Sequence, residues 1–377
     1  MTKSLYSLMA IVALLCTSAA IASTAGQTEV LNAKALPLGD GLISTQARRG
    51  YVFACATEFR TGGSQHAGDW IQGATWDATR KIWVQGDVAW PNAQFSIEIR
   101  TNQRILTGNA LPVGHTTGIF PIARTDPAFQ IDRNPNPLTE QLLTFALPLQ
   151  PTLATNPSCL PMGAIGVAIN GVPIFNALDA AGLDAVAHEV QDRCHGHPQG
   201  RGIYHYHGPS DCVAGASSNN TLVGYALDGF GIYSNHDESG KEITNSDLDE
   251  CHGRTSPVMW NGKLTTIYHY VMTRQYPYTL GCYRGTAVAG HMQSLGSVSK
   301  QPGAARATQQ PGQARHAPPA AVAACTGQAN NSVCSFTSPR GRIIDGNCRS
   351  AGNNRGSGGS GGGNGNNSDY ACIPANH

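Results

Sequence analysis

A short unit that occurs twice constrains the fold of this chain more than any other feature of its sequence. The first copy reads Cys194-His195-Gly196-His197, then Ile203-Tyr204-His205-Tyr206-His207, then Cys212. The second copy reads Cys251-His252-Gly253-Arg254, then Ile267-Tyr268-His269-Tyr270, then Cys282. A repeated, hairpin-like unit of this kind predicts two halves of a fold that are brought together around one site.

The first copy has the spacing that a metal site needs. Residues 203–207 alternate as a β-strand does, so His205 and His207 are expected on one face and Tyr204 and Tyr206 on the other. Residues two apart on a strand lie roughly 6.5–7 Å apart, close enough for two imidazoles to reach one ion. Gly196 would let the backbone bend sharply, so that the two histidines beside it both point inward.

Imidazoles from both copies could bind one ion if the copies pack together. Imidazole nitrogen is a suitable ligand for copper, zinc, nickel and iron. The predicted metal ligands are His195, His197, His205, His207, His252 and His269. Histidines beside tyrosines in strands can also form a buried hydrogen-bonded network without a metal, and this alternative stays open.

The N-terminus and the cysteines together predict export. Residues 1–22 have the form of a secretory signal, with Lys3 as the positive start, residues 8–16 as the apolar core and residues 20–22 as a cleavage site with small side chains. Without Cys16, ten cysteines remain, of which six lie in the body of the chain and four after residue 324. Even numbers in an exported protein favour disulfides that close within each part.

Disulfides would also close each copy of the repeated unit. We expect Cys194 to pair with Cys212 and Cys251 to pair with Cys282. Each bond would close a loop of about 20 to 30 residues and stabilise the fold by a few kcal/mol. Histidine nitrogen is then the main metal ligand left, because the sulfurs are used as cross-links.

Composition argues against several other functions. A formal net charge of +1 and 13% charged residues give no electrostatic basis for binding nucleic acid or an acidic membrane. After the signal, no stretch approaches the ~20 apolar residues that a transmembrane helix needs. Paired cysteines leave little support for a nucleophilic triad.

Short runs rich in Val, Ile, Tyr and Trp predict a mainly β domain. They cover residues 51–56, 81–88, 95–99, 142–149, 163–175 and 222–233. Asn170-Gly171 predicts a hairpin turn, and Asp228-Gly229 a second glycine-rich turn. Residues 177–190 follow Asn176, a typical N-cap residue, and place apolar side chains on one helix face, so a short helix is expected before the first histidines.

The last part of the chain differs in composition. Residues 291–324 are rich in Pro, Gln, Ala and Gly, which indicates a semi-extended linker. Residues 325–377 hold four cysteines and are too few to fold by burial alone, so two disulfides are expected to hold a small module together. Residues 350–368 are almost entirely Gly, Asn and Ser, and we expect a flexible loop there.

The order of these motifs resembles the YHYH-domain family of exported proteins, named for the tetrapeptide at residues 204–207. The resemblance covers about residues 107–285, and its recurring blocks are GHTTGIFP at 114–121, GVAINGVP at 166–173, DGFGIY at 228–233, LDECHGR at 248–254 and YPYTLGC at 276–282. The resemblance implies a secreted domain and no established reaction. The second unit of the family commonly ends in histidine where this chain has Val271, which argues against a symmetric two-metal site.

The sequence therefore divides into four parts. We expect a signal peptide at residues 1–22, a YHYH domain at 23–290, a linker at 291–324 and a four-cysteine module at 325–377. The predicted fold class is mainly β: one β-rich domain with a short helix, followed by the small disulfide-rich module.

The predicted function is binding of a transition metal in the periplasm or outside the cell. Copper is favoured over zinc because all-nitrogen sites rank Cu(II) highest in affinity. The role would be sequestration or delivery, with the metal ion as the partner and neither nucleic acid nor a transmembrane segment involved. One alternative is a metal-dependent enzyme, either a hydrolase or a copper oxidoreductase, with Asp228 or Glu250 as acid and base. The other is a metal-free structural or adhesion protein.

Overall fold

The structure of the chain, a computed structural model, describes residues 31–60, 63–288, 291–294, 320, 323–329, 331–337, 343–350 and 370–374. The expected signal peptide lies outside these residues. Internal contacts divide the chain into two compact units, Met1–Ala304 and Ala305–His377. In the part of the chain that the structure describes, no helix is both long and apolar enough to cross a membrane.

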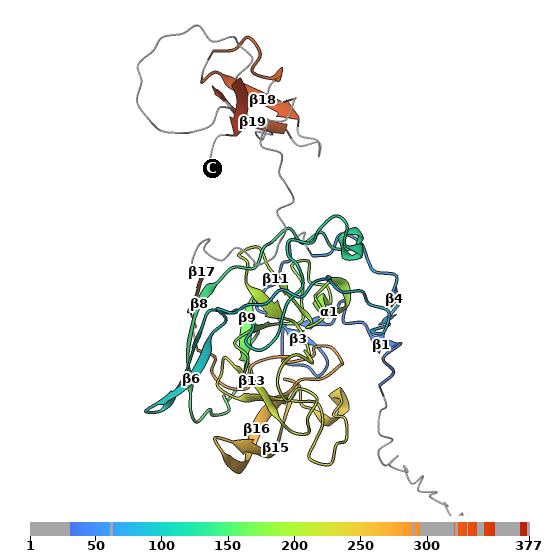
Figure 1. The fold of residues 1–377 in the computed structure, drawn as a ribbon, viewed down its shortest axis with the longest axis vertical. Coiled ribbons are helices and arrows are strands. Elements are labelled where there is room, and N and C mark those ends of the chain that lie inside the picture. Colours follow the sequence, from blue (N-terminus) through green and yellow to red (C-terminus); the bar gives the residue numbers. More distant parts are fainter. Residues whose placement is uncertain are drawn as a thin grey trace, which may run out of the picture. The chain divides into compact units, whose positions relative to one another are not determined.

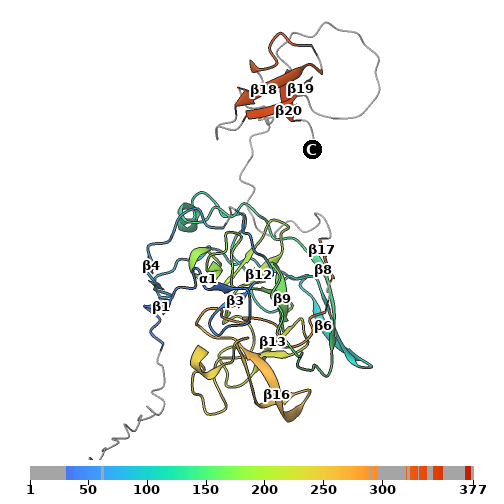
Figure 2. The same ribbon diagram turned by 180° about the vertical axis from the view of Figure 1, so that it is seen from behind.

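An eight-stranded sheet at the centre of the first unit carries both copies of the repeated unit (Figures 1 and 2). Its strands are β9 (Ala164–Ala168), β10 (Pro173–Phe175), β11 (Gly196–Pro198), β12 (Tyr204–Tyr206), β13 (Leu222–Ala226), β14 (Gly231–Tyr233), β15 (Gly253–Trp260) and β16 (Lys263–Val271). Their order across the sheet is β11-β12-β10-β9-β13-β14-β16-β15. This order is a palindrome of two halves, β9 to β12 and β13 to β16.

The two halves also have the same internal pairing. In each half, the first two strands are antiparallel, the second pairs in parallel with the fourth, and the third is antiparallel to the fourth. β9 and β13 pair antiparallel at the centre, where Val167 lies opposite Tyr225 and the neighbouring pairs are symmetric about it. An approximate two-fold rotation perpendicular to the sheet therefore relates the two halves.

The turns of the two central hairpins lie where the sequence predicts them. Asn170-Gly171 joins β9 to β10, and Asp228-Gly229 joins β13 to β14. Gly171 and Gly229 have φ values of 83° and 92°, a left-handed conformation that glycine adopts without strain. Both predicted turns are confirmed.

Smaller sheets surround the central one. A four-stranded sheet in the order β17-β8-β7-β6 lies on the opposite side of the first unit from the short strands β1 and β4 (Figures 1 and 2). Its strands are β6 (Phe95–Arg100), β7 (Gln103–Gly108), β8 (Gln141–Pro148) and β17 (His291–Ser294). β17 includes the first residues of the stretch expected to be a linker. The remaining short elements of the unit are β1 (Leu36–Pro37), β2 (Ile43–Ser44), β3 (Val52–Phe53), β4 (Ile71–Gln72), β5 (Thr75–Trp76) and the 3-10 turns Pro127–Gln130 and Asn245–Asp247.

The helix before the first histidines is shorter than the sequence predicts. Only α1 (Ala185–His188) is helical, and Asp184 caps it by accepting a hydrogen bond from the backbone N–H of Ala187. Gly182 has a φ of 81°, and a left-handed residue cannot continue a right-handed helix. The predicted helix over residues 177–190 is therefore wrong in its first half.

Disulfides cross-link each unit internally, as the even cysteine counts predict. The first unit contains Cys55–Cys159 and the two expected pairs Cys194–Cys212 and Cys251–Cys282. The second unit is a three-stranded antiparallel sheet of β18 (Val333–Thr337), β19 (Ile343–Ser350) and β20 (Tyr370–Pro374), with the bonds Cys325–Cys348 and Cys334–Cys372. Among the residues of this unit that the structure describes, the buried hydrophobic core consists of these four cysteines, so the disulfides take the place of a larger core there. The mainly β fold class is confirmed.

Candidate metal centre

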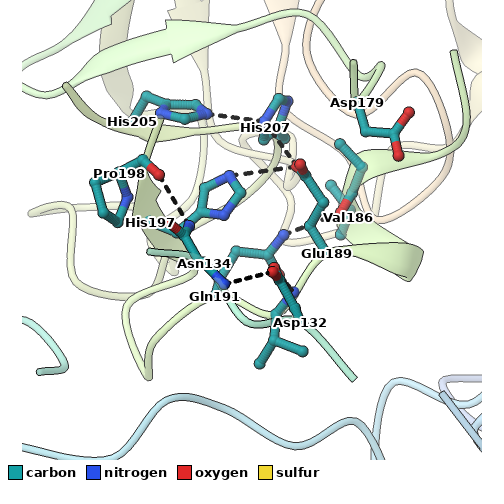
Figure 3. Close-up of polar contacts among 12 residues, drawn as sticks. Asp132, Asn134, Asp179, Val186, Glu189, Gln191, His197, Pro198, His205 and His207 are labelled. Carbon is teal, nitrogen blue, oxygen red and sulfur yellow. Dashed lines mark hydrogen bonds and ion pairs between the residues drawn. The ribbon is translucent and has the colours of Figure 1, made fainter. Parts of the chain in front are cut away.

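The β11–β12 hairpin brings three of the predicted histidines together. His197 lies opposite His205 in the antiparallel register, and His207 directly follows β12. One ligand atom from each lies within 4.8 Å of the others, and all three side chains are buried. Figure 3 shows the three rings gathered beside the Glu189 carboxylate. These residues, which we call the three-histidine site, could hold a metal ion.

The strand alternation that the sequence predicts separates the histidines from the tyrosines. The hydroxyl of Tyr204 donates to the Asp192 carboxylate at 2.9 Å. The hydroxyl of Tyr206 accepts from the side-chain amide of Asn170 at 3.0 Å and contacts Nε2 of His115 at 2.7 Å. The tyrosines thus bond to a different set of residues from the histidines, and they fix the strand from its other face.

The hydrogen bonds of His205 and His207 determine which ring nitrogens are protonated. A carbonyl oxygen only accepts, so Nδ1–H of His205 donates to the Ile203 oxygen at 3.0 Å, and Nδ1–H of His207 donates to the Asn176 oxygen at 2.5 Å. In the neutral rings, each Nε2 then carries a lone pair. The two Nε2 atoms lie 3.0 Å apart, so two acceptors face each other. A cation between them would replace this repulsion by coordination.

Protonation does not resolve this contact, because burial keeps the rings neutral. Burial lowers the pKa of His207 to about 4, and it lowers the pKa of His205 well below the usual 6.5. The pKa of His197 is also well below its usual value, first because of burial and then because of the other two histidines. At neutral pH all three side chains are therefore neutral imidazoles, the form that binds metals.

His197 and Glu189 contribute further buried atoms without partners beside the two Nε2 atoms of His205 and His207. Among the described residues, both ring nitrogens of His197 lack a hydrogen-bond partner, and Oε2 of Glu189 also lacks one. Oε2 of Glu189 lies 3.3 Å from Nε2 of His197 and 3.4 Å from Nε2 of His207. Burial, together with the nearby carboxylates of Asp132 and Asp179, raises the pKa of Glu189 well above its ordinary value. Buried polar atoms normally have partners, so this arrangement fits a metal ion.

The spacing of these atoms also fits a metal ion. Zinc–nitrogen bonds are about 2.0–2.1 Å long, which places tetrahedral ligands roughly 3.3 Å from one another. The contacts of 3.0, 3.3 and 3.4 Å among the three histidines and Glu189 are close to that separation. The residues present therefore fit a first-row transition metal in both chemistry and distance.

A family model places the site in a recognised domain. Residues 144–244 match the model described as YHYH protein. The chain contains a YHYH domain. The match includes Glu189 and the three-histidine site, and it ends before β15. No curated protein and no solved structure matches the chain.

Neighbouring residues hold the histidines of the YHYH domain in place. The ring of Phe175 stacks on that of His205, with centroids 3.9 Å apart. Asp192, which is buried, accepts from the backbone N–H groups of Cys194 and Gly196 and so fixes the start of β11. Burial raises the pKa of Asp192 to about 6, although its hydrogen bonds act in the opposite direction. Bonds of this kind from outside the ligand set orient metal ligands in proteins.

A cavity of about 750 Å³ opens beside the three-histidine site. All three histidines and Glu189 line it, together with apolar side chains such as Phe59 and Phe175 and polar ones such as Asn134 and Gln65. This volume lies within the range of pockets that bind small molecules. A metal held by the three histidines would therefore be accessible from the cavity.

His195 lies apart from the other histidines of the first unit. Its φ is 62°, and its side chain is exposed and lines a separate cavity of about 320 Å³. The sequence suggests that Gly196 lets the rings of His195 and His197 both point inward, but only the ring of His197 does so. A Cβ at Gly196 would lie 2.2 Å from the Tyr204 ring, so the YHYH domain uses this glycine to admit the tyrosine.

His252 and His269 lie in the other half of the sheet. β12 and β16 are five strand positions apart in the palindromic order, which corresponds to roughly 24 Å at the usual strand spacing. Nε2 of His252 contacts the Thr273 hydroxyl at 2.9 Å, and Nδ1–H of His269 donates to the Ile267 oxygen at 3.0 Å. The six imidazoles therefore do not meet at one point, because symmetry places the two copies on opposite sides of the central hairpins.

The acidic residue beside the histidines is Glu189, which the sequence analysis missed. Asp228 accepts from the Tyr270 hydroxyl at 2.6 Å and from the Gly285 N–H at 2.9 Å, so it belongs to the second half. Glu250 precedes Cys251, also in the second half. Glu189 could have been noticed as a carboxylate shortly before the first Cys-His-Gly-His motif. Its place beside the histidines depends on long-range packing of the segment that ends in α1, which the local sequence does not indicate.

Proposed function

We propose that this chain is an exported protein whose YHYH domain binds one transition-metal ion through His197, His205 and His207. The observation that carries the proposal is the contact between the two Nε2 lone pairs of His205 and His207. Both rings are committed by their Nδ1–H bonds to backbone carbonyls, and both are too buried to protonate. A purely hydrogen-bonded network would place a donor against an acceptor at this distance.

Copper is the first candidate for this ion, and zinc is the second. Three imidazoles form a nitrogen-rich set of intermediate softness, for which Cu(II) has the highest affinity among divalent first-row ions. Zinc binds three histidines with similar bond lengths. The role that we propose is sequestration or delivery of the ion.

Export is part of the same proposal. The N-terminal sequence has the pattern of a secretory signal, and the five disulfides are compatible with an oxidising, extracellular location. In such a compartment the cysteines are unavailable as thiolate ligands, so the histidines would provide the metal affinity.

The test is elemental analysis of protein purified from an oxidising compartment. The wild-type protein should contain one copper or zinc per chain, and a His205→Ala/His207→Ala variant should contain less than a tenth of that amount. His269→Ala is the matched control, because His269 occupies the position of His205 in the other half of the sheet and should leave the metal content unchanged. Equal metal in the wild-type and double-variant proteins would overturn the proposal.

The cavity supports a second candidate function, a metal-dependent enzyme. Catalytic metals keep a coordination position open to substrate, and the three-histidine site lies on the wall of a cavity of about 750 Å³. A bound metal would supply Lewis-acid or redox chemistry there. Azide added to Cu(II)-loaded protein should give a charge-transfer band if the open position exists. A spectrum that azide leaves unchanged would favour sequestration or delivery.

A further inference from the structure

Glu189 is held rigidly at the edge of the three-histidine site. It follows α1 directly, and its backbone N–H donates to the Ala185 oxygen at 3.1 Å. The helix itself is fixed at both ends: Asp184 caps its start, and the indole N–H of Trp70 donates to the Ala187 oxygen at 2.8 Å. The Lys81 ammonium donates to another carbonyl oxygen of the same helix. Glu189 therefore reaches the histidines from a position that several contacts determine.

The Oε2 atom of Glu189 has the surroundings of a ligand atom. It lies 3.3 Å from Nε2 of His197 and 3.4 Å from Nε2 of His207, and it has no hydrogen-bond partner among the described residues. Figure 3 shows this carboxylate turned toward both rings. Buried polar atoms normally have partners, and a cation placed between these atoms would provide one for the carboxylate oxygen and for the ring nitrogens.

We propose that Glu189 is the fourth protein ligand of the metal, and that the site consequently prefers a divalent ion over Cu(I). This inference rests on the proposed metal-binding function. Three imidazole nitrogens and one carboxylate oxygen form a set with one negative charge, which suits Cu(II) or Zn(II). Cu(I) is a soft, monovalent ion that prefers sulfur and nitrogen, so it gains little from a carboxylate.

Asp179 provides a control that separates the charge of Glu189 from the position of its oxygen beside the histidines. Asp179 is also buried, lines the same cavity and has an oxygen without a partner in the described part of the chain. Its other oxygen accepts from two backbone N–H groups in its own loop. In Figure 3 its carboxylate points away from the three rings. Asp179→Asn therefore removes a buried charge near the site without removing an atom that faces the histidines.

The experiment compares the wild-type protein with Glu189→Gln and Asp179→Asn, each as the full exported chain. Zn(II) and Cu(II) are titrated in competition with a chromophoric chelator, and Cu(I) in competition with bicinchoninate. We expect Glu189→Gln to weaken binding of both divalent ions roughly 100-fold and to change Cu(I) affinity less than threefold, because loss of a ligand exceeds the 10–100-fold effect of residues outside the ligand set. Asp179→Asn should change all three affinities less than fivefold.

Two outcomes of these titrations would overturn the inference. Divalent affinity that Glu189→Gln leaves unchanged would show that the carboxylate is not a ligand, and equal losses in both variants would show that only its charge matters. If the wild-type protein binds no ion, the proposed function itself fails. Pulsed EPR of the Cu(II)-loaded wild-type protein provides a measurement that does not depend on folding of the variants. Three coordinated imidazoles and an oxygen ligand are expected, and four nitrogens would contradict the assignment.

Discussion

The two halves of the central sheet share one framework but differ at the site. In each half, one aspartate oxygen accepts hydrogen bonds from two backbone N–H groups and a tyrosine hydroxyl: Asp192 bonds to Cys194, Gly196 and Tyr204, and Asp249 bonds to Cys251, Gly253 and Tyr268. The strand registers make Arg254, His269 and Val271 the counterparts of His197, His205 and His207. The same hairpin framework thus carries three histidines in one half and a single histidine at the equivalent positions in the other.

The largest effect that we predict is a gain of a second metal in the other half. In an Arg254→His/Val271→His variant, a new histidine would lie opposite His269, as His197 lies opposite His205. We expect two ions per chain in place of one, measured by titration with Zn(II). The second ion should bind at least tenfold more weakly, because the second half has no counterpart of Glu189 at the ligand positions and loss of a ligand exceeds the 10–100-fold effect of residues outside the ligand set.

Val271→His alone is the control for this variant. Val271 is fully buried beside Ile243 and Leu248, so a larger side chain will lower stability whether or not a metal binds. The single variant should still bind one ion. A folded double variant that also binds one ion would show that the two halves differ in more than these side chains.

The next effect concerns the two aspartates. Asp192→Ala leaves four donors without their acceptor, because Asp192 also accepts from the Gly118 N–H, and we expect a loss of about 3–5 kcal/mol in the free energy of unfolding. Asp249 is less buried, and Asp249→Ala should lose about 2–3 kcal/mol. Chemical denaturation measures both values. Only Asp192→Ala should also weaken metal binding, and a loss of binding in Asp249→Ala would contradict the separation of the two sites.

Local patterns predicted much of this fold. The alternation of residues 203–207, the turns at Asn170-Gly171 and Asp228-Gly229, and the closed disulfide pairs all depend on neighbours in the sequence or on cysteine counts. Each of these features is confirmed because short-range geometry or covalent bonding determines it. The same reasoning identified His197, His205 and His207 among the candidate ligands.

Long-range pairing could not be predicted in the same way. The sequence reveals two copies of a unit but not the strand order, and the order decides whether the copies meet or lie apart. The position of Glu189 depends on how α1 packs against Trp70 and Lys81, which no periodicity indicates. Placing His252 and His269 at one common site failed for the first of these reasons.

Gly196 and Gly253 follow His195 and His252, the two histidines with positive φ. Substitution of these glycines tests whether the framework is equivalent in the two halves. A Cβ at Gly196 would lie 2.2 Å from the Tyr204 ring, and a Cβ at Gly253 would lie 2.2 Å from the Tyr268 hydroxyl. Gly196→Ala and Gly253→Ala should therefore each lower the free energy of unfolding by about 2 kcal/mol, since each tyrosine must shift. Thermal unfolding measures both changes. Costs that differ by more than twofold would argue against a shared framework.

The smallest effect concerns His195 and His252, which occupy equivalent positions with φ values of 62° and 71°. His252 is buried, and burial lowers its pKa to about 3, whereas the side chain of His195 is exposed. The folded pKa of His252 thus lies below the value of about 6.5 expected in the unfolded chain. As the pH falls below 6.5, the unfolded state binds the proton and the folded state does not, so acid removes stability.

This difference predicts that His252 contributes more than His195 to the pH dependence of stability. Between pH 6.5 and pH 5, His252 should remove roughly 1–2 kcal/mol from the free energy of unfolding, and His252→Gln should abolish that part. His195→Gln should change the slope by less than half as much, because the side chain of His195 is exposed at the surface, although the protein around it also lowers its pKa. Asp184 and Asp192, with pKa values raised to about 6, act in the opposite direction. Their effect is the same in the wild-type protein and in both variants, so differences among the three metal-free proteins in denaturation midpoint at several pH values isolate the histidine contribution. Identical slopes for both variants would contradict this prediction, because they would mean that buried His252 and exposed His195 take up protons equally well.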